Sequence, residues 1–148
     1  MKGYYAVDGG VLYEVATHSD IGDLLREAMK SGEVVASTHE LALTEVLYLM
    51  CRRIGFEKAK RHVESLIFSG LIDLEPTVEL MEIAARIKCS HPLALADCYT
   101  LALAEKRHLV ALFLDRETEL VREISRAPFD VELEFLVDQR NISSGRGL

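Results

Sequence analysis

The sequence has few cysteines and no long uninterrupted apolar run, and both absences narrow the classes of protein it can belong to. Its three cysteines, Cys51, Cys89 and Cys98, are widely spaced and form no CxxC pair. They therefore predict neither a disulfide framework nor a zinc ribbon, and we expect reduced core residues in a cytoplasmic protein. A membrane-spanning helix needs about 18 or more consecutive apolar residues, and no such run exists. The beginning of the chain, MKGYYAVDGGVLYEVA, also lacks the long apolar segment of a signal peptide.

Several motifs that identify well-known chemistries are also missing. The sequence contains no GxxxxGK[ST] loop, no GxGxxG, no GxSxG and no cysteine in a catalytic sequence context. No two of the five histidines have i, i+4 spacing and none has a partner cysteine at ligand spacing, so we expect structural or surface roles for them. The formal net charge of -7 provides no overall positive field for nucleic acid or anionic membranes. A polyanionic ligand would need a local basic patch or bound cations.

The pattern that is present indicates an α/β fold. With 148 residues, 49% of them hydrophobic, the chain is long enough for one domain with its own core. Short apolar runs alternate with longer helical patterns, which is typical of βαβ units and a parallel sheet. We expect a three-layer α/β/α sandwich of about five parallel strands, and we assume the strand order 3-2-1-4-5. Residues 1–138 are expected to form this single domain, and residues 139–148, which show no apolar periodicity, a disordered tail.

Turn and cap residues divide the predicted elements. The expected strands cover residues 4–7, 33–37, 71–74, 109–114 and 131–135. The expected helices run from a cap at Asp20 to Gly32, from a cap at Thr38 to Gly55, over 56–69, over 77–88, from 91 through Asp97, and after Asp115.

Asp97 is the charged residue that the apolar pattern of the expected helices explains least well. On a helix it shares its face with mostly apolar residues: Leu93, Ala94, Thr100, Leu101 and Ala104. A carboxylate on a buried face is strongly disfavoured unless a cation, hydrogen-bond donors or a metal ion satisfies it. The hydroxyl of Thr100 or one arginine would be sufficient, so this alternative stays open.

Three further acidic residues occupy informative positions. Asp8 follows the first expected strand and Asp115 the fourth, so the two carboxylates meet at the sheet's carboxyl edge if these strands are neighbours. Glu45 shares its helix face with apolar residues. Taken singly, Asp8 fits a tight turn with two glycines, Asp115 a helix cap and Glu45 a solvated helix residue. Together, converging carboxylates repel one another unless a divalent cation binds, and carboxylate ligands suit Mg²⁺ or Mn²⁺.

These acids occur in an order that resembles a known family. A strand ending in Asp (YYAVDGG), a helix with Glu (LALTEV), a helix with Asp (LADCYT) and a strand ending in Asp (LFLDRE) are similar to the PIN-domain ribonucleases, many of which are VapC-type toxins. The resemblance covers residues 4–135. It implies that Asp8, Glu45, Asp97, Asp115 and a further acid, Glu117, bind Mg²⁺ or Mn²⁺. It also implies hydrolysis of RNA phosphodiester bonds by an activated water, leaving a 5′-phosphate and a 3′-hydroxyl.

The same resemblance implies partners: an RNA substrate, with Arg116 as a phosphate contact, a second copy in a homodimer, and an antitoxin protein. The basic run RRIGFEKAKR is interpreted as a solvated helix face. Two residues depart from the family pattern, because Gly9 stands where Ser or Thr usually follows the first Asp, and Phe113 where Ser or Thr usually precedes the last Asp by two. These departures leave open a catalytically weak or inactive PIN-like binding or scaffold protein. A more remote hypothesis is a phosphotransfer domain with Asp8 or Asp115 as acceptor.

Overall fold

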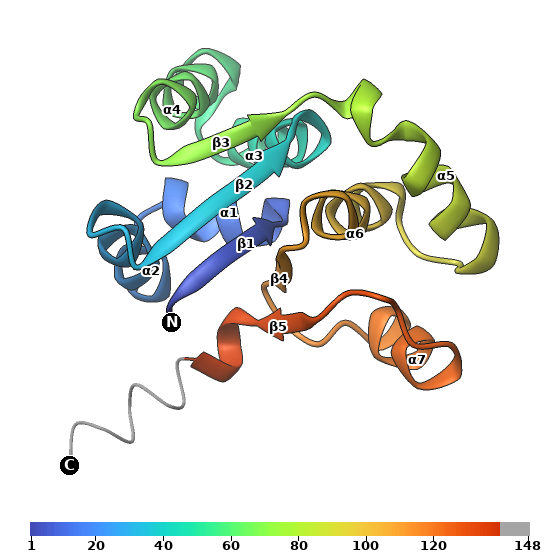
Figure 1. Cartoon of the computed structure of the whole chain (residues 1–148). Coiled ribbons are helices and arrows are strands. Elements are labelled where there is room, and N and C mark those ends of the chain that lie inside the picture. Colours follow the sequence, from blue (N-terminus) through green and yellow to red (C-terminus); the bar gives the residue numbers. More distant parts are fainter. Residues whose placement is uncertain (140–148) are drawn as a thin grey trace.

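Five parallel strands form one sheet in the computed structural model, which describes residues 1–139 (Figure 1). The strands are β1 Gly3–Val7, β2 Val34–His39, β3 Ile72–Glu75, β4 Val110–Phe113 and β5 Leu133–Phe135. Their order is β3-β2-β1-β4-β5, and every neighbouring pair is parallel. The predicted fold class and the assumed strand order are both confirmed. Residues 140–148, most of the predicted disordered tail, lie outside the described residues.

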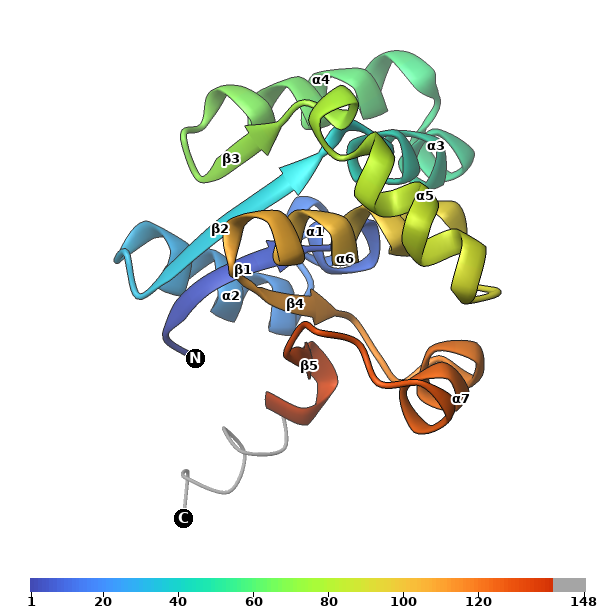
Figure 2. The ribbon, with the colours of Figure 1, turned by 45° about the vertical axis from the view of Figure 1, so that its right-hand side comes forward.

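Helices cover both faces of the sheet. The first face packs against α1 Gly9–Ala16, α2 Asp20–Lys30, α3 Glu40–Ile54 and α4 Phe56–Phe68. The second packs against α5 Met81–Ser90, α6 Leu95–Arg107 and α7 Thr118–Arg126. In Figure 2, α6 lies in front of β1 while α2 lies behind it. The sheet therefore separates two hydrophobic cores, as expected for a three-layer sandwich.

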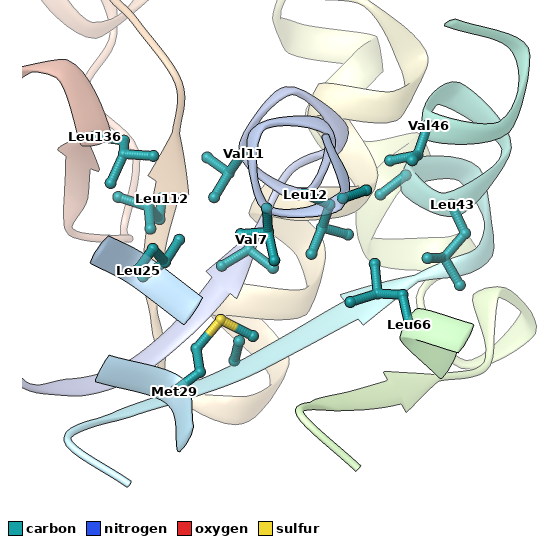
Figure 3. Packing of buried hydrophobic residues seen from close by; sticks show 14 of the residues in the cluster. Val7, Val11, Leu12, Leu25, Met29, Leu43, Val46, Leu66, Leu112 and Leu136 are labelled. Atoms are coloured by element: carbon teal, nitrogen blue, oxygen red, sulfur yellow. The ribbon is translucent and has the colours of Figure 1, made fainter. Parts of the chain in front are cut away.

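The alternation of strand side chains divides the apolar residues between these cores. Val7 and Leu112 enter the first core, whereas Ala6 and Phe113 enter the second. Figure 3 shows Val7 and Leu112 beside Val11 of α1 in the first core. Full burial of such a side chain stabilises the fold by roughly 1.5–3 kcal/mol. A shift of one residue in a strand would move each of these side chains to the other face, so their burial fixes the strand register.

Helix α1 is the element that the sequence patterns did not predict. Two adjacent glycines, Gly9 and Gly10, begin it, and each costs about 1 kcal/mol relative to alanine in a helix. Asp8 offsets part of this cost as the N-cap, because its Oδ1 accepts a hydrogen bond from the Val11 N–H at 2.9 Å. Val11 and Leu12 are then buried against the sheet. Tertiary burial thus outweighs a sequence that locally favours a turn.

Several helix ends differ from the predicted ones. The helix expected to be capped by Thr38 is capped by His39, because β2 continues through both residues. Ser19 rather than Asp20 caps α2, since its hydroxyl accepts from the Gly22 N–H. Helix α6 begins at Leu95 rather than at residue 91, and residues 77–88 divide into a 3₁₀ turn at Thr77–Glu79 followed by α5. The expected stop of α3 at Gly55 is confirmed, with φ of 84°.

The crossing of α1 and α2 requires a glycine. A Cβ atom added to Gly22 would lie 1.9 Å from the carbonyl oxygen of Glu14, far inside van der Waals contact. The second helix therefore packs directly on the backbone of the first, and any side chain at position 22 would force the two helices apart.

The buried carboxylate of Glu123 attaches α7 to His91, in the loop before α6. The carboxylate of Glu123 is only 3% exposed and accepts hydrogen bonds from Arg126 Nε at 2.8 Å and from His91 Nδ1 at 3.0 Å. The Arg126 hydrogen bonds are the first cause of a lowered pKa of Glu123. This contact fixes α7, the helix that follows Asp115 in the chain.

The structure also tests what the sequence predicted for the cysteines and for membrane-spanning helices. All three cysteines are free thiols, but only Cys98 is fully buried and Cys89 is exposed. The expectation that all are core residues was wrong for Cys89, which lies on an outward-facing position of α5. Within residues 1–139, no helix is both long and apolar enough to cross a membrane.

Candidate active site

Asp8 lies at the carboxyl edge of the sheet, between the ends of β1 and β4. Its backbone N–H donates to the Leu112 carbonyl oxygen at 3.1 Å, and Val7 pairs with Leu112 across the two strands. Burial is the first cause of a pKa raised well above the ordinary value of an aspartate. The hydrogen bond from Val11 opposes this shift, and the charges of Asp97 and Glu45 add to it.

Glu45 lies in the second turn of α3 and reaches the first turn of α1. A Cβ atom on Gly9 would lie 3.0 Å from both Cβ and Cδ of Glu45, and 3.0 Å from the Ala42 carbonyl oxygen. The absence of a side chain at Gly9 therefore allows the half-buried Glu45 to pack against α1, the helix that Asp8 caps. This close approach gives a physical reason for the glycine at a position where the resemblance led us to expect Ser or Thr.

Asp97 lies in the first turn of α6 and is half-buried. Burial and then the charges of Glu117 and Glu45 raise its pKa from 3.8 to about 7. The alternative that Thr100 satisfies this carboxylate is wrong, because the Thr100 hydroxyl bonds to His39 and to the Ala96 carbonyl oxygen. No arginine or lysine in residues 1–139 forms an ion pair with Asp97 either, judging from the salt bridges of this part of the chain.

The three carboxyl groups share a fourth charged neighbour. Burial first and Glu117 second raise the pKa of Glu45, and Glu117 also contributes to the raised pKa values of Asp8 and Asp97. Asp115 is exposed and lies two residues beyond the end of β4. Of the two carboxylates in this loop, Glu117 is the one whose charge raises the pKa values of Asp8, Glu45 and Asp97. The structure therefore brings Asp8, Glu45 and Asp97 into one electrostatically coupled group with Glu117.

Asp115 does not cap the helix that follows it. The N-cap of α7 is Glu117, whose backbone N–H donates to the Asp115 carbonyl oxygen at 3.1 Å. The cap interpretation of Asp115 was therefore wrong, and the residue is exposed in the loop after β4. Within residues 1–139, no three His, Cys, Asp or Glu side chains are arranged as they stand to hold one metal ion.

The order, spacing and convergence of these acids can now be compared with known proteins. A model of the PIN domain matches residues 5–124. The chain belongs to the PIN domain family. Among curated proteins, none matches the chain.

Solved structures share the PIN fold at low sequence identity. The Mycobacterium tuberculosis toxin VapC20, described as cleaving the sarcin-ricin loop, has 17% identity and a TM-score of 0.62 over 81% of this chain and 94% of its own. PAE2754 from Pyrobaculum aerophilum has 20% identity and a TM-score of 0.55 over 97% and 90%. VapBC2 from Rickettsia felis, bound to a DNA fragment from the promoter, has 14% identity and a TM-score of 0.59 over 90% and 98%. Likeness at this level concerns the fold alone.

Arg116 of this PIN domain already has partners within the chain. Its guanidinium donates to Asp138 Oδ2 at 2.7 Å and lies 4.8 Å from the centre of the Phe135 ring. The side chain nevertheless keeps 60% of its surface exposed. Its expected contact with an RNA phosphate therefore stays a prediction, and such a contact would compete with Asp138.

A polar group next to the acids was missed by the sequence reasoning. Among residues 1–139, five polar or charged residues are fully buried: Ser37, Thr38, His39, Thr100 and Glu123. The first three are consecutive at the end of β2, and Thr100 lies on α6 one turn after Asp97. The signal that could have revealed them was a polar run, STH, at the carboxyl end of an expected strand. The sequence predicts a specific role only for Thr38 of this run, as a helix cap.

Proposed function

We propose that this PIN domain is a metal-dependent endoribonuclease that hydrolyses RNA phosphodiester bonds. The observation that carries the proposal is the coupled group of Asp8, Glu45 and Asp97. Burial and neighbouring carboxylates, Glu117 among them, raise the pKa values of all three half-buried groups. Their ionised forms are therefore unfavourable in isolation, and a divalent cation is the usual means of stabilising them.

The donor set fits Mg²⁺ or Mn²⁺. Only carboxylate oxygens converge in this group, and hard cations with oxygen ligands match that chemistry better than zinc. Asp8, Glu45 and Asp97 would hold the ion, with Glu117 and Asp115 at the exposed side. When bound, such an ion supplies positive charge that activates a water for attack on phosphorus and neutralises charge on the phosphate.

The chain's own residues would prepare this site in two ways. The Val11 N–H donates to Oδ1 of Asp8 and restrains the rotamer of that side chain, whose Oδ2 has no hydrogen bond from this donor. Asp97, with a pKa raised to about 7, is partly protonated at neutral pH without a cation. Cation binding would therefore release protons, and the affinity would rise as the pH rises toward neutrality.

The substrate and partners are proposed by analogy with the family. One structural neighbour is described as a toxin that cleaves the sarcin-ricin loop, and another is VapBC2 bound to a DNA fragment from the promoter. We extend to this chain an RNA substrate and an antitoxin-like protein partner, and we expect a homodimer. Large exposed apolar side chains are available for such contacts, including Phe68 at 83% and Val78 at 69% exposure. Copurification with a small protein encoded beside this chain, and the mass in solution by light scattering, test the two expectations.

The decisive experiment compares RNA cleavage by the intact protein and by Asp97→Asn. We expect cleavage of mixed RNA that requires Mg²⁺ or Mn²⁺, stops with a chelator and is lost in Asp97→Asn. Products with 5′-phosphate ends would match the chemistry. Cleavage that persists in chelator or in the variant would remove the acidic group from the reaction.

A second candidate function is a binding or scaffold role without catalysis. It is favoured by Gly9, where the packing of Glu45 leaves little room for the hydroxyl-bearing side chain that the family usually has, and by Phe113, which is buried in the second core. This hypothesis predicts no rise in melting temperature on adding Mn²⁺. A rise that disappears in Asp8→Asn would contradict it.

A further inference from the structure

The buried polar residues at the end of β2 require an explanation, because burying a polar group is unfavourable unless it is hydrogen-bonded. Thr38 and His39 have no measurable exposure, and Thr100 is 1% exposed. All three are hydrogen-bonded, and each has a partner in another element of the fold. Their partners identify what these bonds hold in place.

His39 joins two helices through both of its ring nitrogens. The Ala42 N–H of α3 donates to Nδ1 at 3.2 Å, so this nitrogen carries the lone pair and the hydrogen lies on Nε2. Nε2 lies 2.8 Å from Thr100 Oγ1 of α6 and therefore donates to it. The Thr100 hydroxyl in turn donates to the Ala96 carbonyl oxygen at 3.3 Å.

The imidazole is held in its neutral form. Burial lowers the pKa of His39 from 6.5 to about 4, and the charge of Glu40 only partly opposes this. A neutral ring has one donor and one acceptor, and both are used here. The ring is therefore a rigid connection with a fixed tautomer at neutral pH.

The elements joined by these bonds are those that carry the acidic group. His39 caps α3, which carries Glu45 in its second turn, and the bond network ends on Ala96, the residue before Asp97. The adjacent Thr38 donates to the Val7 carbonyl oxygen at 3.0 Å, next to Asp8. Repulsion between Glu45 and Asp97 favours separation of the two helices, and the buried hydrogen bond opposes it.

We propose that the His39–Thr100 hydrogen bond is a positioning bridge that sets the distance between Glu45 and Asp97, so that both carboxylates can bind one divalent cation. The inference rests on the proposed metal-dependent function. Neither bridge residue touches the ion or the RNA, and both act through the helices that carry the ligands.

The first test measures Mn²⁺ binding by calorimetry with the full chain. Thr100→Val keeps the shape of the side chain but removes the acceptor, whereas Thr100→Ser keeps the hydroxyl. We expect the dissociation constant to rise about tenfold or more in Thr100→Val, as for other residues that support metal ligands, and to change by less than about threefold in Thr100→Ser. Unchanged Mn²⁺ binding in Thr100→Val would overturn the bridge.

A matched control separates positioning from general destabilisation. Val63 is buried in the first core on α4 and takes no part in the bridge, so Val63→Ala lowers stability by removing packing alone. We expect it to lower the melting temperature yet to bind Mn²⁺ within about threefold of the unaltered protein. Equal weakening in Val63→Ala and Thr100→Val would mean that stability, and not the bridge, sets the affinity.

A double-mutant cycle tests whether the two residues act together. Asparagine is a good N-cap, so His39→Asn keeps the cap of α3 but is too short to reach Thr100. We expect His39→Asn to weaken Mn²⁺ binding as Thr100→Val does, and the double variant to be no weaker than either single one. Additive losses would overturn the bridge.

A measurement without metal distinguishes failure of the bridge from failure of the proposed function. Long-range ¹H–¹⁵N NMR of the metal-free protein should show His39 as the neutral Nε2–H tautomer from pH 5 to 8. Titration of His39 in that range, or the other tautomer, would overturn the bridge even if Mn²⁺ binds tightly. Absence of Mn²⁺ binding to the unaltered protein would instead overturn the proposed function, and the bridge with it.

Discussion

Replacing Asp97 with asparagine removes a charge from a half-buried carboxyl group with little change in its shape. The group has no ion-pair partner among residues 1–139, and burial, Glu117 and Glu45 raise its pKa from 3.8 to about 7. Without a cation, the ionised form therefore opposes folding. We expect Asp97→Asn to be more stable than the unaltered protein in chelator at neutral and alkaline pH.

The sign and the size follow from proton linkage. Between about pH 4 and pH 7 the folded protein binds more protons at Asp97 than the unfolded chain does, so stability falls as the pH rises through this window. A shift of roughly 3 pH units corresponds to about 4 kcal/mol at most, at 1.36 kcal/mol per unit. Partial access of solvent screens the charges, so we expect a gain of about 2 kcal/mol at pH 8 and almost none at pH 4.

Urea unfolding of both proteins in chelator, at pH 4 and pH 8, measures this difference. The exposed carboxylate of Asp130 lies away from the group, so Asp130→Asn serves as the control and should show no such pH-dependent gain. An equal loss of stability in Asp97→Asn at both pH values would refute the reasoning. It would mean that hydrogen-bond donors hold the carboxylate and that no unfavourable charge needs a cation.

Three further changes test other parts of the structure. Gly9→Ala places a methyl group against Glu45 and should lower the free energy of unfolding, measured in urea, by about 1–3 kcal/mol. It should also weaken Mn²⁺ binding, and unchanged binding would contradict the close packing of α1 on α3. Gly22→Ala pushes α2 off the backbone of α1 and should cost about 3 kcal/mol or more, which a melting curve checks, and a small change would contradict the crossing. Glu123→Gln weakens the buried hydrogen bond to Arg126 and should lower the melting temperature more at pH 7 than at pH 3. The pKa of Glu123 is lowered in the folded protein, so the stability that its carboxylate contributes is present above the ordinary pKa of a glutamate and is lost as the pH falls. Equal effects at the two pH values would argue against an ionised Glu123.

The strands could be predicted because their signal is local. Runs such as those ending at Val7 and Phe113 are apolar on both sides, as strands covered by helices on both faces must be. Helix α1 could not be predicted this way, since Gly9 and Gly10 indicate a turn and only burial against the sheet makes the helix favourable. The cap of α3 was displaced by one residue for a similar reason. The Thr38 hydroxyl donates to Val7 on the neighbouring strand, and His39 instead accepts from the Ala42 N–H of α3.

Some features of the candidate site could likewise be predicted from the sequence, and others could not. Asp97 and Glu45 were identified because a charge on an apolar helix face is visible in a single segment, and Asp8 because it follows a strand. The influence of Glu117 and the exposure of Asp115 depend on how the loop after β4 turns, which no local pattern encodes.

The amino-acid sequence alone determined the alternation of strands and helices and the identity of the charged residues, because hydrophobic periodicity and unexplained charge are properties of short segments. Tertiary structure alone decided which of these charges meet, and that a neutral His39 bonds to Thr100, 61 residues away. Those outcomes depend on strand order and on helix packing across the sheet, where contacts between distant segments, rather than local propensities, determine the lowest free energy.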